Sequence, residues 1–202
     1  MKKNNTNSGF WFAYIETLTG LATIFLVLFL AATSQERKIT KQNESLLNSW
    51  KEANNKLITL NAAPVPDSLM GGMRITLTDK LFFSLGSPKL TNQGNDKIKE
   101  ISKVIADFYC TNSLFRSQMR IKIGGHTDKL GGDDVNFPLS YQRAQNISRI
   151  MQEVFYKSDL KKSIITPIAY GSKYPLPGHT NEIEPMNRRI TIVLELISTK
   201  LL

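Results

Sequence analysis

The sequence predicts an α+β domain that follows one N-terminal membrane-spanning helix and a helical linker. Two observations predict this architecture. One stretch near the amino end is too long and too apolar for a soluble core. The second half of the chain alternates between the two-residue period of strands and the period of about 3.6 residues that is typical of helices. With 202 residues, of which 41% are hydrophobic, the chain is long enough for one domain with these appendages.

The first element is an apolar stretch at residues 10–32, preceded by a polar tail at residues 1–9. As a helix it would be about 34 Å long, which is enough to cross a bilayer. A secretory signal peptide is the alternative, since the small residues Ala31 and Ala32 resemble a cleavage site. However, the apolar region of a signal peptide is about 7 to 15 residues long and lacks acids. We therefore expect a retained transmembrane helix.

Glu16 is the one acidic residue in this apolar stretch. An ionised carboxylate near the middle of a membrane helix costs about 2.5 to 3.5 kcal/mol on insertion scales, so its presence needs a reason. One interpretation is a carboxyl group that takes up and releases a proton inside a partly dry helix interface. The other is a side chain that reaches the membrane surface or bonds Thr17 or Thr19. The residues alone leave both open.

The linker, residues 33–66, carries apolar residues in alternating steps of four and three. The series is Ile39, Asn43, Leu46, Trp50, Ala53, Leu57 and Leu60. This pattern predicts a coiled coil of about three heptads, and hence a parallel homodimer in which Asn43 fixes the register. An amphipathic helix that lies on the membrane or on a partner is the alternative. Pro64 and Pro66 exclude a continued helix and predict an extended tether.

The globular domain is expected at residues 67–202. Its periodicity predicts strands at Met73–Thr78, Arg120–Ile123, Ile164–Tyr170 and Arg189–Leu196, and helices at Asp96–Tyr109 and Ser140–Phe155. The order β-α-β-α-β-β predicts helices on one face of a mixed sheet, with functional residues in the loops that follow the strands.

Charge and composition exclude several function classes. The net charge of +9, from 26 Lys and Arg against 17 acids, favours an anionic neighbour such as lipid headgroups, cell-wall polymer or nucleic acid. The basic residues are not clustered with aromatic residues, so we expect no nucleic-acid binding. Cys110 is the single cysteine and therefore cannot form an intrachain disulfide. His126 and His179 are the only histidines, and no arrangement of residues suggests an enzyme, a metal site or a cofactor. We expect His126 to be structural.

Several short motifs then follow one another at characteristic spacings. They are Leu81-Phe82-Phe83-Ser84, Gly125-His126-Thr127-Asp128, Leu139-Ser140 with Arg143-Ala144, and Asn187-Arg188-Arg189. Together they resemble the OmpA C-terminal-like peptidoglycan-binding domain, although Ala169 stands where that family usually has glycine.

The resemblance implies a binding site for the cell-wall stem peptide, whose diamino acid bears an ammonium and a carboxylate. Asp128 would bind the ammonium, and Arg143 would bind the carboxylate through its planar guanidinium. Thr127 and Asn136 would add hydrogen bonds, and Arg189 is a further contributor. Without the resemblance, Asp128 and Arg143 could equally form a salt bridge with each other.

The membrane stretch carries a second resemblance. Ala13–Thr19 and the apolar run Phe25–Leu30 are similar to the single helix of MotB, the flagellar stator subunit, in which an aspartate replaces Glu16. This implies that Glu16 carries protons, that a multi-spanning protein like MotA is a partner, and that residues 34–51 take the place of the plug segment. A wall-binding domain also implies a bacterial inner-membrane protein with a cytoplasmic N-terminus and a periplasmic C-terminal domain. The Zorya anti-phage systems share this layout, and a passive OmpA-like wall tether is the alternative function.

Overall fold

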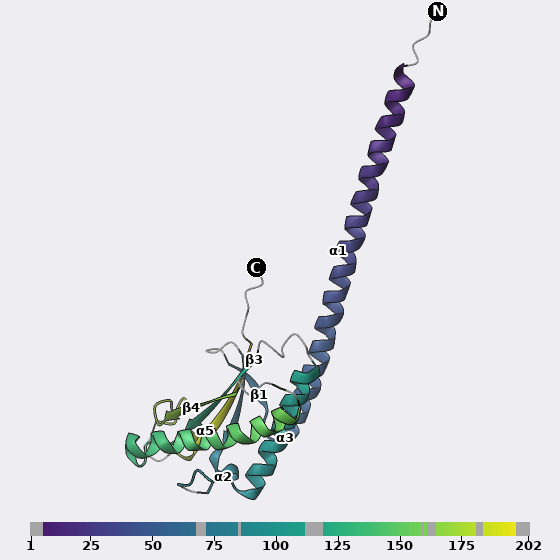
Figure 1. Cartoon of the computed structure of the whole chain (residues 1–202). Helices are drawn as coiled ribbons and strands as arrows, with labels where there is room; N and C mark the ends of the chain where they lie inside the picture. Colours follow the sequence, from purple (N-terminus) through teal and green to yellow (C-terminus); the bar gives the residue numbers. More distant parts are fainter. Residues whose placement is uncertain are drawn as a thin grey trace, which may run out of the picture. The chain divides into compact units, whose positions relative to one another are not determined.

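The computed structural model describes residues 6–67, 72–84, 86–111, 119–158, 160, 165–180 and 184–196 (Figure 1). The chain divides into two compact units, Met1–Asn48 and Ser49–Leu202. Each unit is described by itself.

Helix α1 runs from Thr6 to Thr59, and its part up to Asn48 belongs to the first unit. One window of this helix has a mean hydropathy of 2.1 and none of it is buried. Within the described residues it is the one helix long and apolar enough to cross a membrane, by length and composition. The predicted helix over residues 10–32 is therefore confirmed, and its place in a membrane stays a prediction.

In the second unit, α1 ends in a left-handed turn at Asn61, whose φ is 53°. The Ala62 N–H donates to the carbonyl of Leu57 over 2.9 Å, and the Asn61 N–H donates to the carbonyl of Ile58 over 3.0 Å. These two bonds satisfy carbonyl groups that the end of a helix leaves unpaired. The helix stops before Pro64, as the sequence predicts.

The residues after this turn are not a free tether. Strand β1 (Pro64–Asp67) pairs antiparallel with strand β2 (Gly72–Thr78) and forms one edge of the sheet. Proline lacks the N–H that a residue of a central strand must donate, but proline is tolerated in an edge strand, where one side has no neighbouring strand. The expected extended conformation is present, and it is used for strand pairing.

The second half of the predicted coiled-coil seam packs inside the chain. Ala53 and Leu57 are buried, with 7% and 1% of their surface exposed. Trp50 packs edge-on against Phe108 of helix α3 (Asn92–Thr111), with ring centroids 5.2 Å apart. This half of the predicted seam therefore packs within its own domain, and pairing of the linker with a second copy stays a prediction. Ile39, in the first half, stays 51% exposed.

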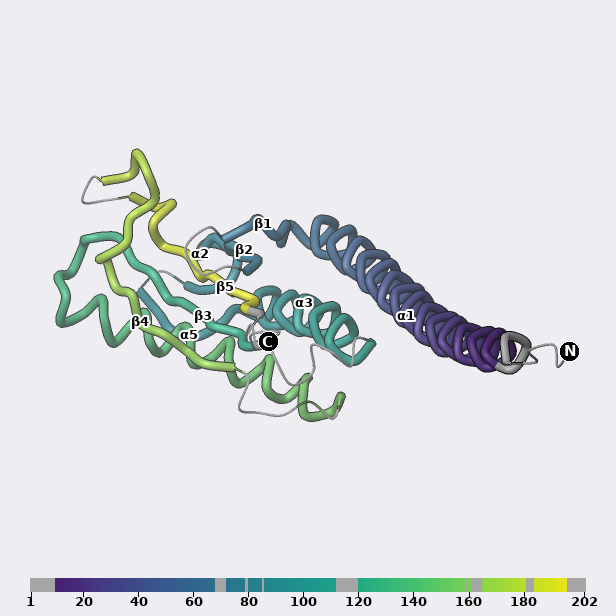
Figure 2. The backbone as a smooth tube through the Cα atoms, turned by 90° about the horizontal axis from the view of Figure 1, so that it is seen from above, coloured from purple at the N-terminus to yellow at the C-terminus, as the bar shows by residue number. Residues whose placement is uncertain are grey.

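The sheet has five strands in the order β1-β2-β5-β3-β4. Strand β3 (Met119–His126) runs parallel to β4 (Ile165–Gly171), and β5 (Arg189–Leu196) lies antiparallel between β2 and β3 (Figure 2). The predicted strands are confirmed within one to three residues, and the first residue predicted for β4, Ile164, lies outside the described residues.

Helices α3 and α5 (Gly132–Lys157) pack together on one face of this mixed sheet (Figure 1). The core between the layers is built from Ile75, Leu77, Ile121, Ile123, Ile190, Ile192 and Leu194 of the sheet and from Ile98, Ile101, Ile105, Ala144, Ile147, Met151 and Phe155 of the helices. The short element α2 (Asp79–Phe82) lies between β2 and α3, and η2 (Pro185–Asn187) lies in the connection between β4 and β5. The predicted α+β class is therefore confirmed.

Helix α5 begins eight residues before its predicted start at Ser140. Two glycines with positive φ, Gly131 and Gly132, stand at its beginning, and Pro138 lies inside it. Such residues are typical of turns, which is why the sequence pattern placed the helix start too late. The difference matters because the added turns carry Asn136.

Candidate functional site

The candidate site lies at the sheet edge where β3 and β4 end together. Because these strands are parallel, the residues that follow them meet at the same edge. The Thr127 N–H donates to the carbonyl of Gly171 over 2.9 Å and joins the two strand ends. Asn136, in the first turns of α5, donates from Nδ2 to the backbone carbonyl of Asp128 over 3.1 Å. The loop that carries Thr127 and Asp128 is thus bonded on both sides.

Helix α5 approaches this edge closely because Gly125 has no side chain. A Cβ atom at this position would collide with the carbonyl oxygen of Ser140. The Ser140 hydroxyl donates to the carbonyl of Phe137 over 2.8 Å and accepts the Gly171 N–H over 3.1 Å. Ser140 therefore fixes α5 to the end of β4, and with it the side chains of Asn136 and Arg143 on the same helix.

Asp128 is 5% exposed and lies 3.3 Å from Arg188, measured from Oδ2 to Nη1. Arg188 is the residue just before β5. The sequence analysis named Arg188 only as part of a motif and gave it no role. The open alternative of an Asp128–Arg143 salt bridge is not the pairing found, since the structure pairs Asp128 with Arg188.

Arg143 is 2% exposed and is the largest of the fully buried side chains in the described chain. Its Nε donates to the carbonyl of Ser87 over 3.0 Å, and its Cζ lies 5.0 Å from the centroid of the Phe83 ring. A buried guanidinium requires such partners, because charge is costly away from water. Phe83 and Ser87 thus set the plane of this guanidinium.

Thr127 supplies the least satisfied polar atom of the site. The residue is 4% exposed, and its Oγ1 has no hydrogen-bond partner within the described part of the chain. Buried polar atoms are nearly always paired, by protein, water or ligand. The orphan hydroxyl sits directly beside Asp128 in the sequence, so a polar group bound there would satisfy it.

The arrangement of these residues agrees with a comparison against known families. The sequence pattern of the OmpA family matches residues 82–189, which is 108 of the 202 residues. The chain belongs to the OmpA family. Residues 82–189 contain the candidate site residues Thr127, Asp128, Asn136, Arg143 and Arg189.

Two proteins related in sequence share part of the OmpA domain. Outer membrane porin F of Pseudomonas fluorescens is 27% identical over 124 residues, which are 61% of this chain and 34% of porin F. The Escherichia coli K12 protein described as lipoprotein YfiB is 25% identical over 125 residues, 61% of this chain and 71% of YfiB. The match thus spans about a third of the length of porin F.

Solved structures show the same fold at lower identity. A MotB-like protein from Desulfovibrio vulgaris superposes with a TM-score of 0.54 at 21% identity, covering 77% of this chain and 98% of that protein. The cell wall anchor of the T6SS from Pseudomonas aeruginosa has a TM-score of 0.51 at 14% identity, covering 70% and 92%. These neighbours confirm the predicted MotB-like OmpA fold.

In the OmpA domain, Arg189 contacts a loop. It is 7% exposed and donates from Nη2 to the carbonyl of Tyr174 over 2.9 Å and from Nη1 to that of Asn187 over 3.3 Å. Burial, and then the nearby Arg74, lower the pKa of Arg189 to about 10, so it stays charged at neutral pH. These contacts favour a positioning role over the direct ligand contact expected from the sequence.

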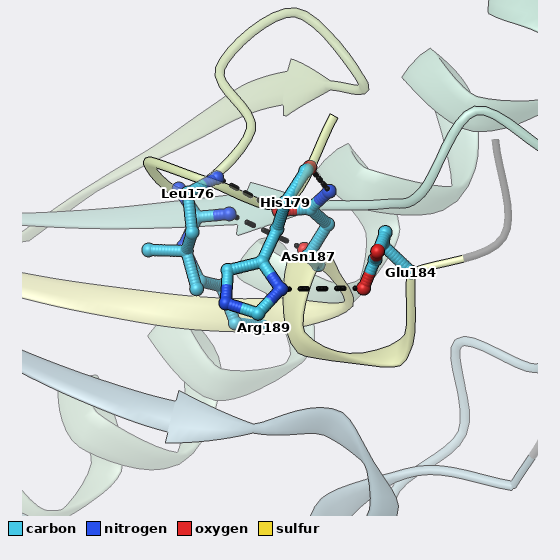
Figure 3. A network of polar contacts seen from close by, with 5 residues as sticks. All are labelled: Leu176, His179, Glu184, Asn187 and Arg189. Atoms are coloured by element: carbon cyan, nitrogen blue, oxygen red, sulfur yellow. Dashed lines mark hydrogen bonds and ion pairs between the residues drawn. The ribbon is translucent and has the colours of Figure 1, made fainter. Parts of the chain in front are cut away.

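Figure 3 shows the network that holds this loop. Asn187 accepts the Leu176 N–H at Oδ1 over 2.8 Å and donates from Nδ2 to the carbonyl of His179 over 2.7 Å. His179 Nδ1 lies 3.3 Å from Glu184 Oε2. The asparagine of the Asn187-Arg188-Arg189 motif therefore stabilises the loop, while Arg188 faces Asp128.

His126 has a structural environment in the OmpA domain. Its ring stacks on Tyr170 at 4.7 Å, and its Nε2 lies 3.2 Å from Thr191 Oγ1. Burial, helped by Arg189 and Arg74, lowers the pKa of His126 to about 3, so the ring is neutral. Among the described residues, no group of three or more His, Cys, Asp or Glu side chains could hold a metal ion.

Proposed function

We propose that the chain is a cell-wall anchor whose OmpA domain binds the peptidoglycan stem peptide while α1 spans the bacterial inner membrane. The observation that carries the proposal is the buried Asp128 carboxylate beside the unpaired Thr127 hydroxyl, at the edge where β3 and β4 end. A carboxylate enclosed in this way suits a ligand ammonium, since charge-assisted hydrogen bonds gain strength away from water.

The other site residues fit the remaining part of a diamino acid. Arg143 would bind the ligand carboxylate, because its bond to Ser87 fixes the plane of a fork that matches two carboxylate oxygens. Thr127 would donate or accept one further hydrogen bond. Asn136 would hold the Asp128 backbone, and Arg189 would hold the rim loop through Tyr174 and Asn187.

The comparisons support this proposal at the level of the family and the fold. The OmpA pattern covers the whole site, and the fold is shared with a protein described as a cell wall anchor. A domain that binds the cell wall would lie in the periplasm, which would leave the amino end in the cytoplasm. The same proposal gives the chain a binding role and no catalytic one.

Sedimentation with purified cell-wall sacculi tests this site. We expect the full-length chain in mild detergent to cosediment, and Asp128→Ala and Arg143→Ala to raise the dissociation constant at least tenfold, which corresponds to roughly 1.4 kcal/mol or more. Asp134→Ala and Arg120→Ala are matched controls, because both side chains are exposed. Binding by Asp128→Ala equal to wild type would refute the site.

We further propose that the membrane segment makes this anchor a subunit of a proton-driven stator. Glu16 lies on an exposed apolar helix face, and the hydroxyls of Thr17 and Thr19 donate to backbone carbonyls of the preceding turn. The hydroxyl protons of Thr17 and Thr19 are therefore bonded to the backbone and not to the Glu16 carboxylate. This supports a Glu16 carboxyl group that serves proton transfer. Two copies of the chain would sit within a multi-spanning partner like MotA, and each proton would release about 2.3 kcal/mol per 100 mV.

This complex could serve a flagellar-type motor or a Zorya-type anti-phage defence, which share the layout. A passive wall tether without ion conduction is the second candidate. It is favoured by the extent of the family match, since residues 82–189 include the site and exclude α1.

The mass of the intact complex, purified in mild detergent, separates these functions. Two copies of the chain with several copies of a multi-spanning protein are expected for a stator, whereas the chain alone is expected for a passive tether. Glu16→Gln should then stop proton-driven function and leave the complex assembled. A stator that works normally with Glu16→Gln would exclude Glu16 as the proton carrier.

A further inference from the structure

A groove runs along the outer side of the helical layer, between α3 and α5. Its walls are Asn92, Asn95, Lys99 and Lys103 from α3 and Asn146, Ile150, Glu153 and Lys157 from α5. Two hollows of about 330 and 530 Å³ share Lys99, Ile150 and Glu153 and thus form one continuous channel. Each wall extends over twelve residues of helix, or about 16 Å between its first and last residues.

The groove is strongly basic. Its lining includes the cations Lys89, Lys99, Lys103, Arg149 and Lys157 and a single carboxylate, that of Glu153. Asp96 approaches Lys99 to 3.7 Å from outside the groove, but it is 75% exposed, and such ion pairs are weak. Cations gathered along one channel raise the local concentration of anions, so the groove suits an extended anionic chain.

The groove begins next to the candidate site. Asn146 donates from Nδ2 to the carbonyl of Pro88 over 2.8 Å, at the mouth of the groove. The neighbouring Ser87 carbonyl accepts the bond from Arg143 Nε. The Ser87–Pro88 segment therefore separates the guanidinium of the site from the first residues of the groove. A polymer held at Arg143 would have its next charged groups near Lys89 and Lys99.

We propose that this groove binds a second anionic part of the peptidoglycan, the carboxylates of a stem peptide adjacent to the one held at Asp128. The inference rests on the proposed wall-binding function and extends it from one peptide to the polymer. Lysines along the walls pair with carboxylates as point charges, while Ile150 and Val154 offer apolar surface to peptide side chains. An acidic partner protein would carry similar charge, but the continuity with Arg143 favours the wall polymer.

The test compares two ligands and uses the full-length chain in mild detergent. In the variant Lys99→Gln, Lys103→Gln, Lys157→Gln, three cations are removed and side-chain length is nearly kept. At low ionic strength we expect about tenfold weaker binding to intact sacculi, consistent with three partly exposed charge pairs. Binding of one soluble stem peptide should equal that of wild type. The wild-type advantage on sacculi should shrink as salt is added.

A matched triple variant, Lys51→Gln, Lys80→Gln, Lys97→Gln, removes the same charge outside the groove and should bind sacculi as wild type does. Equal losses in both triple variants would overturn the proposal, because net charge alone would then explain binding. An unchanged groove variant would overturn it as well. Asp128→Ala should lose both the soluble peptide and the sacculi. If Asp128→Ala kept sacculi binding while the groove variant lost it, the groove would stand and the proposed site at Asp128 would fail.

Discussion

Arg188 donates from Nη1 to Oδ2 of Asp128 over 3.3 Å, so a guanidinium just before β5 holds the carboxylate just after β3. The two side chains are 18% and 6% exposed. A ligand ammonium would meet a carboxylate that is already oriented by this pair. The pair therefore links the stability of the domain to the geometry of its candidate site.

Removing Arg188 should expose this coupling. We expect Arg188→Ala to lower the free energy of unfolding by about 1 to 3 kcal/mol, because it leaves a buried carboxylate without its cation. The double variant Asp128→Asn, Arg188→Ala should lose less than the sum of the two single variants, as expected for residues in contact. Denaturant unfolding of the four proteins completes the cycle. Strict additivity would show that the pair does not interact.

The end of α1 should contribute to the stability of the domain. Leu57 is 1% exposed, so Leu57→Ala should lower the free energy of unfolding by about 2 to 5 kcal/mol through lost burial and a cavity. Leu47→Ala is the matched control on the same helix, since Leu47 is 52% exposed, and it should change stability by less than about 0.5 kcal/mol. The fluorescence of Trp50, which packs on Phe108, can follow unfolding. Equal effects of the two variants would contradict the packing of α1 on its own domain.

Gly125→Ala should separate α5 from the end of β3. The added methyl group would collide with the Ser140 carbonyl, which is backbone and cannot rotate away. We expect a loss of at least about 2 kcal/mol in unfolding free energy and weaker wall binding, because Asn136 and Arg143 move with the helix. Gly20→Ala is the control, since a Cβ there meets nothing within 4 Å. A stable Gly125→Ala variant with full binding would rule out this close approach as a requirement.

The burial of His126 predicts a pH dependence of stability. The pKa of this imidazole is about 3 in the folded chain and 6.5 as the ordinary value, so the unfolded chain binds the proton more strongly. Stability should be complete above pH 6.5 and fall as the pH drops from 6.5 toward 3, by up to about 1.4 kcal/mol per pH unit. His126→Gln should flatten this slope in denaturant unfolding measured across that range. An unchanged slope would assign the pH dependence to carboxylates.

The helices and strands of the domain could be predicted because their periodicity is local. Alternation in Met73–Thr78 and helical spacing in Asp96–Tyr109 depend on which face of each element is buried, and burial follows the core. The start of α5 could not be predicted in the same way. Gly131, Gly132 and Pro138 are individually typical of turns, and only the contacts of Asn136 and Ser140 show that the helix extends through them.

The residues of the candidate site could be predicted by resemblance, but their pairing could not. Asp128 and Arg188 are sixty residues apart and meet because β5 inserts between β2 and β3. The sequence also does not reveal that adjacent arginines diverge, Arg188 toward Asp128 and Arg189 toward the Tyr174 carbonyl.

The seven-residue spacing of the linker predicted which helix face is covered but not what covers it. It correctly indicated a helix face that packs inward, with Ala53 and Leu57 buried and Trp50 half-buried, but a period does not identify the partner. A second copy of the chain and the domain's own α3 both satisfy it. The structure decides for α3 through Trp50 and Phe108.

The central place of β5 has a consequence for how the protein is made. This strand is the last one described in the chain, yet both β2 and β3 require it as a neighbour. During synthesis the sheet stays divided into two halves until Arg189–Leu196 has emerged, and Arg188, whose guanidinium holds Asp128, comes just before that strand. Pairing across such sequence distance is a late folding step. The contact that orients the Asp128 carboxylate therefore forms only after the last described strand has been made, so an unfinished chain lacks the assembled candidate site.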